Sequence, residues 1–214
     1  MPRVKGFHIE EDGTRVVEFY GSQSERLRCE CEELVEHEHF NEAREKLDAL
    51  HDLGMAEWDW KMMAKIEIGC LSVKPSQQKI GNAVKVWAEA ASRDCGDYAD
   101  TYVEMADEVI EKYCSAHKIP VNCDNFEEAN VKQTVQLLDF IYESFLVPGA
   151  DSSMNLEEYG FFEPVKFGIR HLAEKGEMNK AKVMYKKIVK AGSGHYKSFM
   201  EAEKPFMMNQ EITL

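Results

Sequence analysis

The sequence lacks any long apolar run. No window approaches the roughly 18 to 20 consecutive apolar residues that a membrane-spanning helix requires, and the opening residues, MPRVKGFHIEEDG, lack the apolar core of a secretory signal. We therefore expect a cytoplasmic protein without membrane association. Proline is also scarce, with six among 214 residues, while stretches rich in Ala, Glu, Lys and Leu are long. This composition favours a mostly helical chain.

Catalytic motifs are lacking as well. The sequence has no G-x-S-x-G nucleophile turn, no Walker-type phosphate loop, no G-x-G-x-x-G fingerprint and no HExxH zinc motif. Its six cysteines, in a chain of this length without a secretory signal, are typical of reduced thiols rather than of a disulfide framework. We therefore expect neither an enzyme nor a bound cofactor, although scattered residues can also converge on a catalytic site in three dimensions.

Basic residues are few, and they are unevenly placed. The chain has 26 Lys and Arg against 39 Asp and Glu, a net charge of −13. Residues 1–160 hold 16 basic against 33 acidic residues, a net −17, whereas residues 161–214 hold 10 against 6, a net +4. An acidic surface repels phosphate backbones, so general nucleic-acid binding is disfavoured.

The expected organisation has three parts. Residues 1–22 contain two β-prone runs around Asp12-Gly13, a pair that favours a hairpin turn. They form either a short β-hairpin or a flexible leader. Residues 23–202 are expected to form a single helical domain, and residues 203–214 a C-terminal tail.

Apolar residues at helical spacing predict about eight helices in the middle part. A short interior break is expected at Val147 to Asn155, and a further short helix before the tail. The expected helices are Ser22 or Ser24 to His39, Phe40 to Gly54, Met55 to Leu71, one around Ile80 to Ala90, Tyr98 to Ala116, Phe126 to Phe145, Pro164 to Lys175 and Gly176 to Val189.

Four of these helices share one apolar pattern with a small residue in the same slot. The intervals between the small residues are 40, 51 and 47. Stacked helical hairpins produce such recurrence, because each hairpin buries its apolar face against its neighbours. Any amphipathic helix has a similar spacing, so an irregular multi-helix bundle is the alternative. The copies are Phe40-Ala43-Leu47-Leu50, Ile80-Ala83-Trp87-Ala90, Val131-Thr134-Leu138-Ile141 and Met178-Ala181-Tyr185-Ile188.

The last copy, GEMNKAKVMYKKIV from Gly176 to Val189, resembles the second half of a tetratricopeptide repeat. Phe167-Gly168, on the expected partner helix, is similar to that family's large-then-small pair, so the resemblance is clearest over residues 165–189. Two features depart from the family: its period of about 34 residues is shorter than the intervals here, and no proline closes each hairpin. The resemblance implies an all-α hairpin stack that acts as an adaptor or scaffold by binding a protein segment in a groove.

Basic residues on shared helix faces are the candidate partner-binding residues. Tetratricopeptide proteins that capture acidic tails place Lys and Arg on the first helix of a hairpin, so the resemblance implies such a role for Lys166 and Arg170. The alternative is an ordinary solvated helix surface. An acidic protein or peptide is the expected partner, and the acidic remainder of the chain makes self-association a further expectation. The other candidates are Lys61 and Lys65, and the stripe of Lys182, Lys186 and Lys190.

A second hypothesis is a metal-binding protein, or an enzyme, with its site around Cys29 to His39. Thiolates and imidazoles are zinc ligands, but Cys29 and Cys31 point about 200° apart on a helix, and no CxxC or second Glu-x-x-His completes a site. A solvated acidic helix face is therefore the simpler interpretation. The candidate ligands are Cys29, Glu33, Glu36, His37 and His39.

Overall fold

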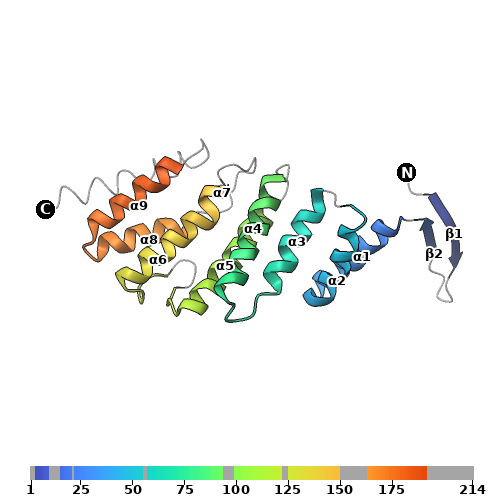
Figure 1. Ribbon diagram of the computed structural model, residues 1–214, viewed down its shortest axis with the longest axis horizontal. Helices are drawn as coiled ribbons and strands as arrows, with labels where there is room; N and C mark the ends of the chain where they lie inside the picture. Colours follow the sequence, from blue (N-terminus) through green and yellow to red (C-terminus); the bar gives the residue numbers. More distant parts are fainter. Residues whose placement is uncertain are drawn as a thin grey trace. The chain divides into compact units, whose positions relative to one another are not determined.

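The computed structural model describes residues 3–9, 15–20, 22–54, 57–93, 99–121, 125–149 and 163–191 (Figure 1). The chain divides into two compact units, Met1–Ala56 and Glu57–Leu214. The helical domain expected over residues 23–202 therefore includes parts of both units. The expected short helix before the tail lies outside the described residues.

The first unit contains a β-hairpin and two helices. Strands β1 (Arg3–Ile9) and β2 (Arg15–Tyr20) pair antiparallel, with a register shift between Val4 and Gly6. Of the two alternatives for residues 1–22, a short β-hairpin or a flexible leader, the paired strands correspond to the hairpin, and the turn residues Asp12 and Gly13 lie outside the described residues.

Helices α1 (Gln23–Glu36) and α2 (Phe40–His51) form a helical hairpin. Helix α1 begins after Ser22 because a capping box satisfies two backbone N–H groups there. The Ser22 side chain accepts a hydrogen bond from the Glu25 N–H at 3.2 Å, and Glu25 accepts one from the Ser22 N–H at 2.5 Å. Between the helices lie the buried side chains of Leu27, Cys31, Ala43, Leu47 and Leu50.

All secondary-structure elements in the described residues of the second unit are helices. Three elements follow one another without interruption and form one long helix: α6 (Val131–Ile141), the π-helical turn η1 (Tyr142–Leu146) and α7 (Val147–Gly149). Counted with it, the described residues of both units form eight helices, as against about eight expected, and apart from the β-hairpin these residues contain only helices as regular elements. The other helices here are α3 (Glu57–Gly69), α4 (Gln77–Arg93), α5 (Ala99–His117), α8 (Glu163–Glu174) and α9 (Met178–Ala191).

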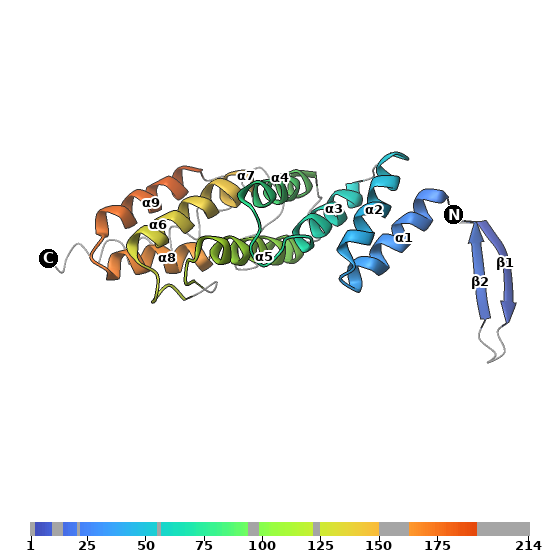
Figure 2. The same ribbon diagram turned by 60° about the horizontal axis from the view of Figure 1, so that its bottom comes forward.

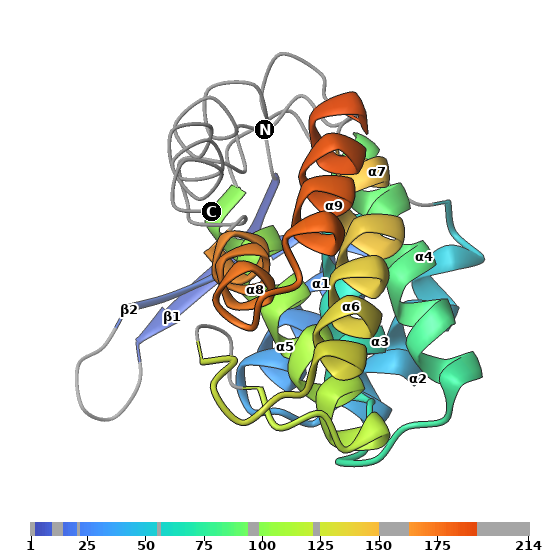
Figure 3. The same ribbon diagram turned by 90° about the vertical axis from the view of Figure 1, so that its left-hand side faces the viewer.

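These helices lie in two layers. Helices α4, α6 and α9 run side by side in one layer, and α5 and α8 lie in the other (Figures 2 and 3). Consecutive helices pair as hairpins, α3 with α4 and α8 with α9. The core between the layers is aromatic: Trp87 of α4 is fully buried, with its ring centroid 5.0 Å from that of Phe145 in η1. The Trp87 Nε1–H donates to the Tyr102 carbonyl at 2.9 Å, which satisfies the indole.

Two expected boundaries of the sixth helix are wrong. It begins at Val131 rather than at Phe126, because the Asn130 side chain caps it by accepting from the Gln133 N–H at 3.0 Å. It also continues past Phe145 to Gly149, so the break expected from Val147 does not start there. The wider π-helical turn precedes Pro148, whose ring would meet the carbonyl of Ser144 in a regular α-helix.

No helix within the described ranges is long and apolar enough to cross a membrane.

Candidate functional site

The candidate site is a groove between α6 and α9, which we call the α6–α9 groove. It has a volume of about 540 Å³, in the range of pockets that hold small ligands or side chains of a partner. Its floor is apolar, with Met184 buried and Val135 half-buried. The residues that line it are Val135, Asp139, Asn179, Lys180, Val183, Met184 and Lys187.

A close approach of α8 to α6 positions α9 beside this groove. Gly168 of α8 faces Leu138 of α6, and a Cβ atom at Gly168 would lie 2.7 Å from Leu138 Cδ2 and 3.1 Å from Phe126 Cζ. Both of these neighbours are buried, so neither can move away freely. Helix α8 can pack this closely against α6 because residue 168 has no side chain. Helix α9 follows α8, so its position depends on the same contact.

The turn from α8 to α9 depends on a second glycine. Gly176 has a φ of 77°, in the left-handed region that favours glycine. The Glu177 N–H donates to the Leu172 carbonyl at 2.9 Å, and the Gly176 N–H donates to the Ala173 carbonyl at 2.9 Å. These bonds end α8, and α9 starts two residues after Gly176.

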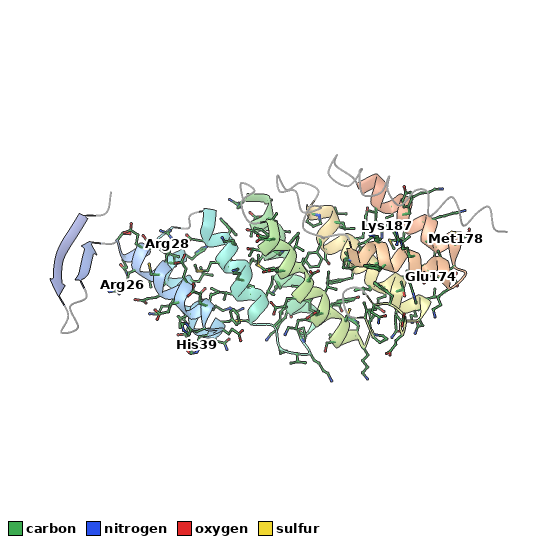
Figure 4. The ribbon with its side chains drawn as sticks, turned by 180° about the vertical axis from the view of Figure 1, so that it is seen from behind. Arg26, Arg28, His39, Glu174, Met178 and Lys187 are labelled. Carbon is green, nitrogen blue, oxygen red and sulfur yellow. The ribbon has the colours of Figure 1, made fainter. Side chains whose placement is uncertain are left out.

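Lys187 joins α9 to the long helix opposite. Its Nζ lies 2.6 Å from Asp139 Oδ1, 3.8 Å from Glu143 Oε1 and 4.3 Å from the centroid of the Tyr142 ring. Tyr142 and Glu143 belong to the π-helical turn, so the turn directs an aromatic face and a carboxylate at the same ammonium. Figure 4 labels Lys187 on α9. The groove thus has one wall fixed by paired charges.

The outer edge of the groove is unusual because it exposes an apolar side chain among lysines. Val183 is 66% exposed. Lys180, Lys186 and Lys187 stand three or four residues away, which places them beside it on the helix surface. Lys180 pairs with Glu177 at 2.8 Å, whereas Lys186 is exposed and has no ion-pair partner within the described part of the chain. This edge can hold an apolar side chain and an anionic group together.

None of the basic residues expected from the sequence is among the described residues that line this groove. Lys182 is half-buried and Lys186 is exposed, both on α9, and the side chain of Lys190 lies outside the described residues. Lys166 and Arg170 are half-buried on α8, with Lys166 Nζ 5.7 Å from the Phe167 ring centroid. Lys61 and Lys65 belong to α3. The groove lining itself comes from α6 and α9.

None of the seven residues that line the groove was among the site residues expected from the sequence. Lys187 and Asp139 pair between helices that are far apart in the chain, and nothing local indicates that pairing. Val183, in contrast, is an apolar residue outside the stripe of Met178, Ala181, Tyr185 and Ile188. An apolar residue on the polar face of a predicted amphipathic helix was therefore an available signal.

The suggested metal ligands lie on the α1–α2 hairpin. Cys29 is exposed, whereas Cys31 is buried and its Sγ donates to the Ala43 carbonyl at 3.6 Å. Glu33, His37 and His39 line a hollow of about 490 Å³, and Glu36 is exposed beside it. In the described ranges no three His, Cys, Asp or Glu side chains are grouped to hold a metal ion.

Charges within this hollow are partly paired. Lys46 Nζ lies 2.6 Å from Glu30 Oε2, and Arg26 Nε lies 3.3 Å from Glu30 Oε1. The hydrogen bond from Lys46 is the main reason that the pKa of Glu30 lies below its ordinary value. The remaining glutamates of the hollow, Glu33, Glu42 and Glu45, are exposed.

Comparisons with protein-family models, with curated proteins and with solved structures find no match to this chain.

Proposed function

We propose that this protein is an interaction module, an adaptor or scaffold, that binds a segment of another protein in the α6–α9 groove. The proposed partner segment carries apolar side chains next to acidic ones. The observation that carries this proposal is Val183, which is 66% exposed between lysines at the edge of a groove with an apolar floor.

The proposed architecture is a short stack of tetratricopeptide-like hairpins. The repeated pattern lies on α2, α4, α6 and α9, and each of these helices carries its small residue at a fully buried position. These residues are Ala43, Ala83, Thr134 and Ala181, all with 0% exposure. A small residue in this slot lets the neighbouring helix approach closely, as Gly168 does on α8. Such stacks generally bind other proteins on extended helical surfaces.

The chemistry of the groove defines the partner. An apolar side chain placed against Val135, Val183 and Met184 gains from burial, about 1.5 to 3 kcal/mol for a residue as large as Val or Leu. An acidic side chain beside it meets Lys186 and the other lysines of α9. This charge pairing adds specificity and speeds association more than it adds affinity. The partner is therefore recognised by an apolar residue with acidic neighbours.

The test uses a matched pair of valines. Val183→Glu places a carboxylate at the groove edge, whereas Val73→Glu makes the same change at a valine that is 70% exposed after α3. Proteins captured by the full chain are identified by mass spectrometry, and the segment that binds is then made as a peptide. We expect that peptide to bind Val183→Glu at least about tenfold more weakly than Val73→Glu and the unaltered chain, a loss of about 1.4 kcal/mol. Equal binding to all three chains would contradict the proposal.

A further inference from the structure

The α1–α2 hairpin has a hollow whose chemistry is the opposite of that around Val183. Leu34 lies in its lining and is half-buried. Four glutamates stand around it: Glu30, Glu33, Glu42 and Glu45. Glu30 is neutralised by Lys46 and Arg26, whereas Glu33 and Glu45 have no ion-pair partner within the described ranges. Lys46, His37 and His39 also line the hollow, so it offers a half-buried leucine with the two carboxylates of Glu33 and Glu45, unpaired in the described part of the chain, beside it.

The edge of the α6–α9 groove offers the complementary charge and an exposed apolar side chain. Val183 projects from α9, and Lys180, Lys186 and Lys187 surround it. Lys186 and Glu33 are both exposed charges without a described partner on their own chain. An exposed valine beside lysines on one surface therefore matches a half-buried leucine beside glutamates on the other.

Charge counts over the two hairpins support the match. Residues 23–51 contain four Lys and Arg against nine Asp and Glu, a net charge of −5. Residues 163–191 contain eight against three, a net charge of +5. The two segments have the same length and opposite charges, whereas the whole chain is at −13. Electrostatic attraction between two copies is therefore directed to these two surfaces. The remaining surfaces carry net negative charge, so they repel those of another copy.

We propose that a second copy of this chain is a partner at the edge of the α6–α9 groove, where the exposed Val183 side chain inserts into the α1–α2 hollow of that copy. This inference rests on the proposed function, since it names one occupant of the same site. Each copy would use its hollow on one neighbour and its groove on another. Such a head-to-tail contact extends into an open chain unless its rotation closes a ring.

The association depends on salt in a defined direction. Contact pairs between exposed lysines and glutamates weaken as the screening length falls from about 10 Å at 0.1 M salt to about 3 Å at 1 M. We therefore expect the average mass of the full chain, measured by sedimentation velocity, to increase with protein concentration at low salt. Raising the NaCl concentration at fixed protein concentration should return the mass towards that of the monomer.

Complementary variants test the geometry. Val183→Glu breaks the groove surface, and the double variant Glu33→Lys with Glu45→Lys breaks the hollow. Each variant alone should associate at least about tenfold more weakly than the unaltered chain. Mixed together, they should form a dimer that does not grow, because each retains one intact surface for the other. The matched controls are Val73→Glu and the double variant Glu104→Lys with Glu128→Lys, which changes the same charge at exposed positions elsewhere and should associate like the unaltered chain.

Three outcomes would overturn the inference. The first is a chain that stays monomeric at every soluble concentration in low salt, which includes the case in which the two surfaces meet within one chain. The second is association that is as strong in both variants as in the unaltered chain. The third is a mixture of the two variants that forms no dimer. Capture of a different protein that depends on Val183 would still support the proposed function, so the two failures are distinguishable.

Discussion

The α1–α2 and α8–α9 hairpins are built alike inside and differ outside. Both turn through a residue with positive φ, Glu38 at 60° and Gly176 at 77°. In both, the N–H of the next residue donates to a carbonyl five residues back, His39 to Leu34 and Glu177 to Leu172. Their net charges, however, are −5 and +5. The buried small residues and the turn therefore determine the hairpin fold, whereas the charge of the exterior can vary and determine which partner binds.

The hairpins also differ in what they pack against. Helix α8 meets α6 through Gly168, so the α8–α9 hairpin belongs to a larger core. The buried side chains of the α1–α2 hairpin form a smaller cluster of their own, which includes Leu27, Cys31 and Leu50. A change at the α8 contact should therefore be transmitted to more of the protein than a change at the α1–α2 turn.

The largest expected effect is at Gly168. Gly168→Ala places a methyl group 2.7 Å from Leu138 Cδ2, and overpacking of this kind costs about 1 to 3 kcal/mol. The better helix propensity of alanine offsets less than about 1 kcal/mol of that cost. We expect a lower urea midpoint by tryptophan fluorescence, which reports on the second unit because Trp58, Trp60 and Trp87 all belong to it.

Gly81 of α4 provides the matched control. A Cβ atom there would meet no atom within 4 Å, so Gly81→Ala should gain about 0.5 to 1 kcal/mol from helix propensity alone. If both substitutions stabilised the protein, the close approach of α8 to α6 would not limit its packing. The difference in sign between the two glycines is the discriminating result.

Much of the fold could be predicted from the sequence because its signals are local. The apolar stripes place most helices within a few residues of their observed bounds, and the small residue of each copy is fully buried in α2, α4, α6 and α9. The start of the sixth helix was missed because Phe126 and Ala129 are buried without being helical, whereas Asn130 caps the helix that follows. Capping chemistry decided that boundary, and hydrophobic spacing did not.

The second expected effect concerns the two turns. Glu38 holds a left-handed conformation that costs a residue with a side chain about 1 kcal/mol or more, so Glu38→Gly should stabilise the first unit. Gly176→Ala introduces the same cost into the α8–α9 turn and should destabilise the second unit by about 1 kcal/mol. Circular dichroism at 222 nm follows helix loss in both units, and tryptophan fluorescence follows only the second. If Glu38→Gly and Gly176→Ala changed stability in the same direction, the two turns would not be equivalent.

The candidate site was less predictable than the fold because its pairs are long-range. Lys187 and Asp139 are 48 positions apart in the sequence, yet Nζ and Oδ1 are separated by 2.6 Å. Spacing along one helix indicated the stripe of Lys182, Lys186 and Lys190, whereas the lysines that line the groove are Lys180 and Lys187. A face can be predicted from one helix, whereas a groove requires knowing which helix lies opposite.

The smallest expected effect is a pH dependence confined to the acidic hairpin. Lys46 donates to Glu30 and lowers the pKa of its carboxyl group from the ordinary value of 4.5. A lowered pKa in the folded state stabilises the protein above the ordinary value, and this stabilisation is lost as the pH falls through the folded pKa. Lys46→Met should therefore destabilise the first unit at neutral pH, and the difference from the unaltered chain should shrink as the pH is lowered below 4.5. Because Glu30 is partly exposed, the effect should also shrink in high salt.

Lys65→Met, at an exposed lysine of α3, is the control and should show no such pH dependence. If unfolding curves recorded by circular dichroism gave the same difference at every pH, the role assigned to the Lys46–Glu30 pair would be wrong, and the acidic hairpin would owe its stability to its apolar contacts alone.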